Sequence, residues 1–313
     1  MVTCCDTDGL LRIRAWRRHN IHIGLSPRVS PVWEGLLCGE SATSDSTADY
    51  ARLFDTALFS VGPRRHRHRN HRPDVTVFTR MRHEGGPEFR WIVIVEDEHM
   101  MYRFPYGYPD RAKRGEMNPR FLDPRSLHRR LLPLLDLFEP QIAAVVLRVG
   151  PIARTEGVRS GTFHERLFRC LDALSVFARS CRFAVELAGP EFVVPEYLVS
   201  LHRRNIVHVP AGQPLLDAFS MPDVLTSDLC VLRSDCLVAE EEGDAWFGFR
   251  QAVRCCLENR TTLYAYLGDG SESITTEEQA DVLRGTGPGR LVRLLAGLDA
   301  DLARLSPIRQ KAA

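Results

Sequence analysis

Short apolar runs rich in β-branched residues recur along most of the chain and alternate with longer stretches whose apolar residues have helical spacing. Each run is four to eight residues long, which is typical of a strand buried in a parallel sheet. The runs cover residues 21–24, 56–61, 89–95, 142–149, 182–187, 206–209, 229–232 and 262–267. Eight strands separated by helices predict an α/β protein with an irregular (β/α)8 barrel of the TIM type. An open, doubly wound sheet is the alternative.

The stretches between the runs carry helix signals. Asp123 and Pro124 suit the N-cap and the first turn of a helix that reaches about residue 138. Pro73 and Asp74 open a second helix to about residue 83, although residues 75–78 have the β propensity of a competing strand. Residues 96–122 show no period and predict a surface excursion. Further helices are expected at about 48–54, 162–179, 195–204, 245–258, 275–284 and 291–305.

Length and composition limit the classes of protein that this chain represents. Its 313 residues are 44% hydrophobic and 26% charged, with 41 Lys plus Arg against 40 Asp plus Glu. This balance excludes a globally basic nucleic-acid binder and an acidic disordered tail. No apolar run approaches the ~18 residues of a membrane span, and the N-terminus lacks the apolar segment of a secretion signal. Nine cysteines without a Cys-x-x-Cys pair indicate reduced thiols, so we expect a soluble cytoplasmic protein without a membrane partner.

The domain organisation expected from these patterns is simple. Residues 1–18 form an N-terminal extension, residues 19–305 a single barrel domain and residues 306–313 a tail. No internal repeat and no long linker divides the chain. The sequence does not indicate an oligomeric state.

Several local patterns follow one another in an order that points to a known family. They are Ile21-His-Ile-Gly24 with Ser26 and Trp33-Glu-Gly35, the segment 50–56, Phe89-Arg-Trp91, the segment 183–187 followed by Pro190 and Phe192, and Leu263-Tyr264. Over residues 20–285 their order and spacing resemble the YecE-like family, bacterial barrel proteins classed as a domain of unknown function (DUF72). The resemblance implies a TIM-type barrel of eight strands and no established activity.

Where the chain departs from the family pattern, it has lost polar residues. The family's Lys on the third strand, an Arg-His pair after the fifth strand and several amides have no counterpart here. The departing positions are Leu58, Ser60, Ile94, Arg148, Ala188, Gly189, Phe192, Leu232, Ser234, Gly268 and Asp269. They fall at the carboxyl ends of strands, where barrel enzymes place their chemistry. We therefore expect either a pocket rebuilt for another ligand or a degraded pocket on a barrel that serves in binding or as a scaffold.

The retained Glu186 is the strongest candidate for a functional carboxylate. It ends a buried strand, and a carboxylate there is costly to bury unless it is paired. Arg148 ends the preceding strand and is the expected partner. The pair suits the catalytic residues of a hydrolase- or isomerase-like enzyme that acts on a small polar substrate. A structural ion pair is the competing interpretation.

Four further residues are candidates for ligand binding. Ser26, Trp33 and Tyr264 belong to the patterns that carry the resemblance. Asp269 lies between two glycines after the last expected strand, where barrel loops often approach a ligand. Gly-Asp-Gly is also a common turn, and its carboxylate repels phosphate, so no phosphate site is assigned to it.

The strongest cluster of charge lies between residues 64 and 72. It contains three histidines and five arginines, Arg64, Arg65, Arg67, Arg69 and Arg72. The arginines are candidates for binding nucleic acid or another anionic partner. The competing interpretation is a solvated, mobile loop, because no aromatic residue is interleaved with the charges.

Other motifs that would indicate a cofactor or a nucleophile are missing from the sequence. It has no Gly-x-Ser-x-Gly elbow, no Walker loop and no Gly-x-Gly-x-x-Gly fingerprint after a strand. His208 lies inside the expected strand 206–209, which favours a core histidine with satisfied hydrogen bonds over a metal ligand. We therefore expect no metal and no cofactor.

Overall fold

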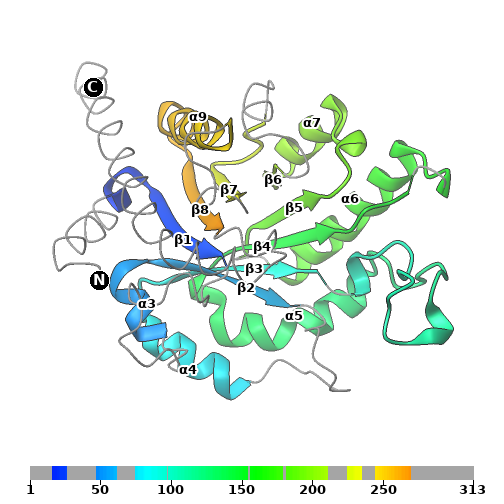
Figure 1. Cartoon of the computed structure of the whole chain (residues 1–313), viewed down its shortest axis with the longest axis horizontal. Helices are drawn as coiled ribbons and strands as arrows, with labels where there is room; N and C mark the ends of the chain where they lie inside the picture. The colour runs from blue at the N-terminus through cyan, green and yellow to red at the C-terminus, as the bar shows by residue number, and fades with distance from the viewer. Residues whose placement is uncertain are drawn as a thin grey trace, which may run out of the picture. The chain divides into compact units, whose positions relative to one another are not determined.

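The computed structural model describes residues 16–26, 47–61, 75–96, 98–153, 156–178, 181–210, 224–234 and 244–268. Strands and helices alternate through these residues, as Figure 1 shows. The strands are β1 (Ile21–Ser26), β2 (Thr56–Val61), β3 (Arg90–Val95), β4 (Ile142–Val149), β5 (Phe183–Leu187), β6 (Val207–Val209), β7 (Leu229–Ser234) and β8 (Thr262–Gly268). Each of the eight predicted runs therefore coincides with a strand to within two residues at either end.

The order of the strands follows the order of the chain. Five strands form one sheet in the order β2-β3-β4-β5-β6, and three form another in the order β1-β8-β7. The pairs β1–β8, β3–β4, β4–β5 and β5–β6 are parallel. The first strand thus pairs with the last, which is the connection of a (β/α)8 barrel and not of an open doubly wound sheet.

The helices agree with the capping and periodicity signals. They are α3 (Thr47–Leu53), α4 (Val75–Gly85), α5 (Pro124–Phe138), α6 (Ser160–Phe177), α7 (Pro195–Arg203) and α9 (Asp244–Glu258). Short 3-10 turns are η2 (Arg17–His19), η4 (Glu98–Met100), η5 (Arg111–Lys113), η6 (Glu139–Gln141) and η8 (Pro190–Phe192). Asp123 caps α5, its carboxylate accepting from the Ser126 amide at 3.1 Å. The helices expected at 275–284 and 291–305 lie outside the described residues.

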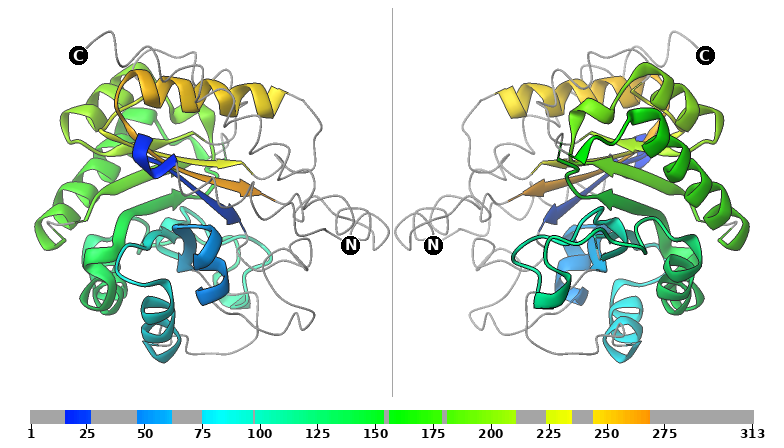
Figure 2. Two further views of the ribbon diagram at one scale, coloured as in Figure 1. Left: turned by 90° about the vertical axis from the view of Figure 1, so that its left-hand side faces the viewer. Right: turned by 90° about the vertical axis from the view of Figure 1, so that its right-hand side faces the viewer.

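The described residues fall into two compact units. One contains β1, α3, α9 and β8, and the other contains α4 to α7 with β3 to β6, while β2 and β7 are divided between them. In the second unit, α4 to α7 lie along the five-stranded sheet (Figure 2). The extension 1–18 and the tail 306–313 lie mostly or wholly outside the described residues, so the single-domain assignment stays a prediction.

The excursion at residues 96–122 is more ordered than its sequence indicated. It contains η4 and η5, and an antiparallel bridge joins Arg103 to Met117. Its apolar side chains Met100, Phe104 and Phe121 are buried. The segment is therefore ordered in part by packing against the rest of its unit, since Phe121 stacks on Phe163 of α6, and no regular period in the sequence indicates such contacts.

In the first unit, a network of hydroxyl groups joins β1, α3, β8 and the start of β2. The Tyr50 hydroxyl accepts from the Leu25 amide at 2.8 Å and donates to the Thr56 carbonyl at 3.0 Å. The Thr56 and Tyr266 hydroxyls are 2.6 Å apart. Gly24 lies against this network: a Cβ there would be 2.6 Å from the Thr56 carbonyl oxygen and 2.8 Å from the Tyr266 ring. Only glycine allows so close an approach of backbone to backbone.

We expect Gly24→Ala to lower the free energy of unfolding by about 1–3 kcal/mol, because the added methyl group would overlap the Thr56 carbonyl oxygen, which is fixed in the backbone. Urea unfolding measures the change. Gly161→Ala is the matched control, since a Cβ at Gly161 meets nothing within 4 Å. Equal stabilities of the two variants would show that the contact at Gly24 is unimportant.

Candidate functional site

Four polar side chains follow one another along the carboxyl ends of neighbouring strands. Ser60 is the next-to-last residue of β2, and Glu96 comes directly after β3. Arg148 and Glu186 are the next-to-last residues of β4 and β5, and the parallel register places them opposite each other. The carboxyl ends of parallel strands are where α/β proteins place their ligands. We call Ser60, Glu96, Arg148 and Glu186 the polar row.

The polar row is linked from end to end. The Arg148 Nε donates to Oε1 of Glu186 at 2.9 Å, and its Nη1 donates to Oε2 of Glu96 at 2.9 Å. The Ser60 hydroxyl donates to Oε1 of Glu96 at 2.5 Å. One guanidinium therefore holds two carboxylates, and a hydroxyl supports the outer carboxylate.

The exposed fraction of the side chain increases along the polar row from Glu186 to Ser60. The Glu186 side chain is only 4% exposed, whereas Arg148 and Glu96 are 32% and 36% exposed, and Ser60 is exposed. A buried carboxylate needs a cation and hydrogen bonds to offset the loss of water, and Arg148 supplies both. Two carboxylates and one guanidinium give these four residues a formal charge of −1.

The structure unites the two residues predicted to carry catalysis, Glu186 and Arg148. Glu96 was not predicted, although a carboxylate directly after the apolar run 89–95 was a usable signal. Ser60 and Arg148 stand where the family carries other polar residues, yet both belong to the polar row. At the ends of β2 to β5, polar residues from neighbouring strands bond to each other, so the loss of polar groups expected there is only partial.

The structure describes two of the four predicted ligand-binding residues, Ser26 and Tyr264, and they do not lie together. Ser26 ends β1 opposite Gly268 of β8. Tyr264 lies toward the other end of β8, where it is 6% exposed and stacks on His22 at 4.5 Å between ring centroids. Trp33, Asp269 and the five arginines of residues 64–72 lie outside the described residues, so their roles stay predictions.

His208 is buried as predicted, whereas the hydrogen bonds expected for its ring are not found among the described residues. Its ring is 3% exposed and lies against Tyr197 of α7, with 5.7 Å between the centroids. Neither ring nitrogen, nor the buried Tyr197 hydroxyl, has a hydrogen-bond partner among the residues described. His208 is placed there because strand alternation turns it toward the covering helix. Burial lowers the pKa of His208 to about 4.

The described part of the chain shows neither a metal centre nor a membrane-spanning helix. No group of three or more His, Cys, Asp or Glu side chains there is arranged to hold a metal ion. None of the described helices has the length and apolar character needed to cross a membrane.

Two solved structures are similar to this chain, and the first of them supports the fold. A DUF72 family protein from Thermotoga maritima matches with a TM-score of 0.50 and 14% identity, over 89% of this chain and 99% of that one. D-psicose 3-epimerase from Clostridium cellulolyticum, solved with D-tagatose, matches with a TM-score of 0.46 and 12% identity, over 86% and 96%. Neither a protein-family model nor a curated protein matches the sequence.

The chain is an α/β protein of the (β/α)8 TIM-barrel class, with a polar row at the carboxyl ends of β2 to β5. The fold is that of the DUF72, or YecE-like, protein from Thermotoga maritima. The structural likeness thus confirms the predicted fold, which is also the fold that the resemblance drawn from the sequence implies.

The buried His208 makes folding sensitive to acid. An unfolded histidine has a pKa of about 6.5, so between about pH 6.5 and pH 4 the unfolded chain binds a proton that the folded chain excludes. The contribution of His208 to the free energy of unfolding is therefore fully present above about pH 6.5. It falls as the pH is lowered, and about 3 kcal/mol is lost at pH 4. We expect His208→Leu to reduce the loss of stability between pH 7.5 and pH 4.5, measured by urea unfolding.

The exposed His202 of α7 provides the matched control. His202→Leu removes a histidine from the same unit without changing the buried ring, so the wild-type pH dependence should persist. A loss of stability in acid that is the same in His208→Leu and in the wild type would contradict the assignment.

Proposed function

We propose that this chain is a binding protein whose barrel takes up a small, neutral, polyhydroxylated molecule at the polar row. The observation that carries the proposal is the gradient of exposure: Arg148 and Glu96 reach solvent, whereas Glu186 lies beneath them with 4% exposure. The solvent-facing groups are the ones that a ligand meets.

The chemistry of these groups indicates the class of ligand. A guanidinium donates hydrogen bonds and a carboxylate accepts them, while a hydroxyl group of a ligand does both. Adjacent hydroxyl groups therefore match the alternation of Ser60, Glu96 and Arg148. The formal charge of −1 on the row disfavours phosphorylated or carboxylated ligands.

Glu186 serves here as a positioning residue for Arg148. A general base must come within hydrogen-bond reach of the proton that it removes. The Glu186 carboxylate is buried, and its Oε1 already accepts from the Arg148 Nε at 2.9 Å. The alternative is a hydrolase- or isomerase-like enzyme that uses Glu186, favoured by the position of a buried carboxylate at the carboxyl end of a barrel strand.

Binding is tested by thermal shift with a panel of neutral sugars and polyols, sugar phosphates and nucleotides. We expect a neutral member to raise the Tm by several degrees. Arg148→Lys keeps a cation beside Glu186 but loses the planar fork, and Glu96→Gln removes an acceptor charge. Each should weaken binding by about tenfold, as expected for a lost hydrogen bond to a charged group.

The matched control is Arg182→Lys, because Arg182 is similarly exposed and pairs with Asp228 at 2.9 Å at the start of β5. This variant should bind like the wild type. Stabilisation by phosphorylated compounds alone, or by no member of the panel, would refute the proposed ligand class.

Glu186→Gln separates binding from catalysis. In the binding proposal, Arg148 loses its buried counter-charge, so the free energy of unfolding should fall by about 2 kcal/mol and ligand affinity should fall with it. If Glu186 is instead a catalytic base, turnover of the bound compound should vanish while the Tm stays nearly unchanged. Glu165→Gln is the control, since its pair with Arg169 at 2.6 Å lies on the surface of α6 and contributes little.

A further inference from the structure

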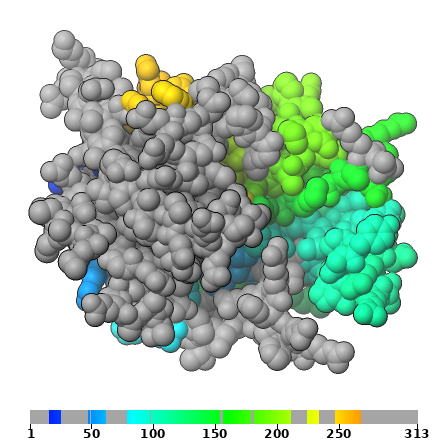
Figure 3. Space-filling view, viewed as in Figure 1, coloured from blue at the N-terminus to red at the C-terminus, as the bar shows by residue number. Residues whose placement is uncertain are grey.

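The tip of the excursion, residues 105–115, presents an aromatic ring to solvent. Tyr106 is 84% exposed, more than any other large hydrophobic side chain that the structure describes as exposed. The excursion forms a continuous part of the surface in Figure 3, where it is blue-green. Single exposed hydrophobic side chains are common on protein surfaces, so the residues around this ring decide whether it can bind a partner.

The Tyr106 ring is supported from one side by the backbone. Gly115 has φ +75°, a conformation that favours glycine, and a Cβ built on it would be 3.4 Å from Cε1 of Tyr106. The Gly115 backbone therefore lies beside the ring, and the small residue leaves room for it. With most of its area in solvent, the ring is available for stacking.

The base of the tip is held in place by hydrogen bonds. The Phe104 amide donates to the Glu116 carbonyl at 3.0 Å, and the Gly115 amide donates to the Phe104 carbonyl at 2.9 Å. Arg103 donates to both carboxylate oxygens of Glu156 at 2.7 Å and also to the Gly115 carbonyl. This fixed geometry lowers the entropy lost when a partner binds.

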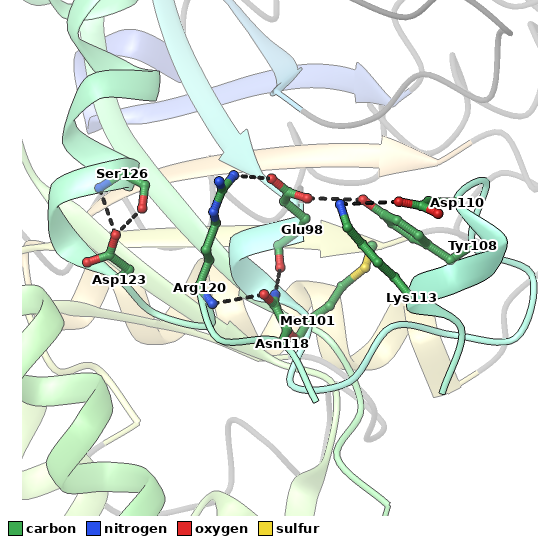
Figure 4. Close-up of polar contacts among 9 residues, drawn as sticks. All are labelled: Glu98, Met101, Tyr108, Asp110, Lys113, Asn118, Arg120, Asp123 and Ser126. Atoms are coloured by element: carbon green, nitrogen blue, oxygen red, sulfur yellow. Dashed lines mark hydrogen bonds and ion pairs between the residues drawn. The ribbon is translucent and has the colours of Figure 1, made fainter. Parts of the chain in front are cut away.

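A second set of bonds supports the excursion from beneath. The buried Asn118 donates to the carbonyls of Glu98 and Met101, at 2.5 and 2.9 Å, and accepts from the Arg120 amide at 2.9 Å (Figure 4). The Glu98 carboxylate accepts from the Tyr108 hydroxyl at 3.0 Å. Tyr108 is thus used inside the excursion, in contrast to Tyr106.

The tip is also positively charged. Arg111, Lys113 and Arg114 are exposed, the tip contains one carboxylate, that of Asp110, and the exposed Glu116 follows directly, so residues 105–116 carry a formal charge of +1. Lys113 lies 3.5 Å from Asp110, and the Arg114 Nε donates to the Tyr108 carbonyl at 2.7 Å. The charges attract anions while the nearby ring offers a flat apolar surface.

We propose that this tip binds single-stranded nucleic acid, with a base stacked on Tyr106 and backbone phosphates beside Arg111, Lys113 and Arg114. Stacking on an aromatic ring and attraction of phosphates by nearby cations are the two contacts by which proteins hold single strands without reading their sequence. An acidic polypeptide would use the cations but has no need of an open ring. The proposal is independent of the ligand assigned to the polar row.

The test is fluorescence anisotropy of a labelled oligothymidylate of about 15 nucleotides with the full chain at low salt. Tyr106→Leu should weaken binding by about tenfold, whereas Tyr106→Phe should retain it because the ring is kept. The double variant Arg111→Gln/Arg114→Gln should reduce the slope of log affinity against log salt by about 1.4, which is about 0.7 for each lost phosphate contact.

The matched control is Arg125→Gln/Arg129→Gln, which removes the same charge from exposed positions of α5 and should leave affinity and slope unchanged. Circular dichroism melting checks that every variant is folded. Three results would each overturn the proposal: no binding by the wild type, loss of binding only when the arginines of residues 64–72 become serine, or equal binding of polyglutamate with no effect of Tyr106→Leu.

Discussion

The ion pair between Arg148 and Glu186 is the interaction on which the candidate site depends. The Glu186 carboxylate is almost completely buried, and leaving it unpaired there would cost several kcal/mol. Arg148 offsets that cost and extends to Glu96, so the inner carboxylate fixes the position of the outer groups. The buried Glu186 therefore orients the side chains of the polar row that reach solvent, Arg148 and Glu96.

Strand register decides which polar side chains meet. The β4–β5 pairing sets Arg148 opposite Glu186, and the β5–β6 pairing sets Val185 opposite His208. Because neighbouring residues of a strand point to opposite faces, Glu186 joins the polar row while His208 turns toward α7. A shift of register by one residue would exchange these faces and leave the carboxylate against the aromatic rings. The same sheet thus satisfies one polar side chain and leaves the other without a partner among the described residues.

Much of the local structure was predictable, because its causes are local. Asp123 and Pro124 start α5 where capping requires, and the helix at 75–85 forms although residues 75–78 have β propensity. The excursion was not predictable in the same way. Its order comes from residues distant in sequence, such as the Gly150 amide, which donates to the Met100 carbonyl, and Glu156, which holds Arg103. The periodicity of apolar residues in the sequence does not indicate such contacts.

The sequence by itself determined the alternation of strands and helices, and hence the barrel class, since apolar period and end-capping act within a few residues. It also indicated that Glu186 needed a cation and that Arg148 was near, because consecutive strands of a parallel sheet are neighbours. Only the tertiary structure decided that Ser60 and Glu96 complete the row, that Tyr264 lies toward the far end of its strand, and that His208 is buried without a partner among the described residues. Those outcomes depend on register and on side-chain contacts between distant segments, for which the linear order of residues carries no direct signal.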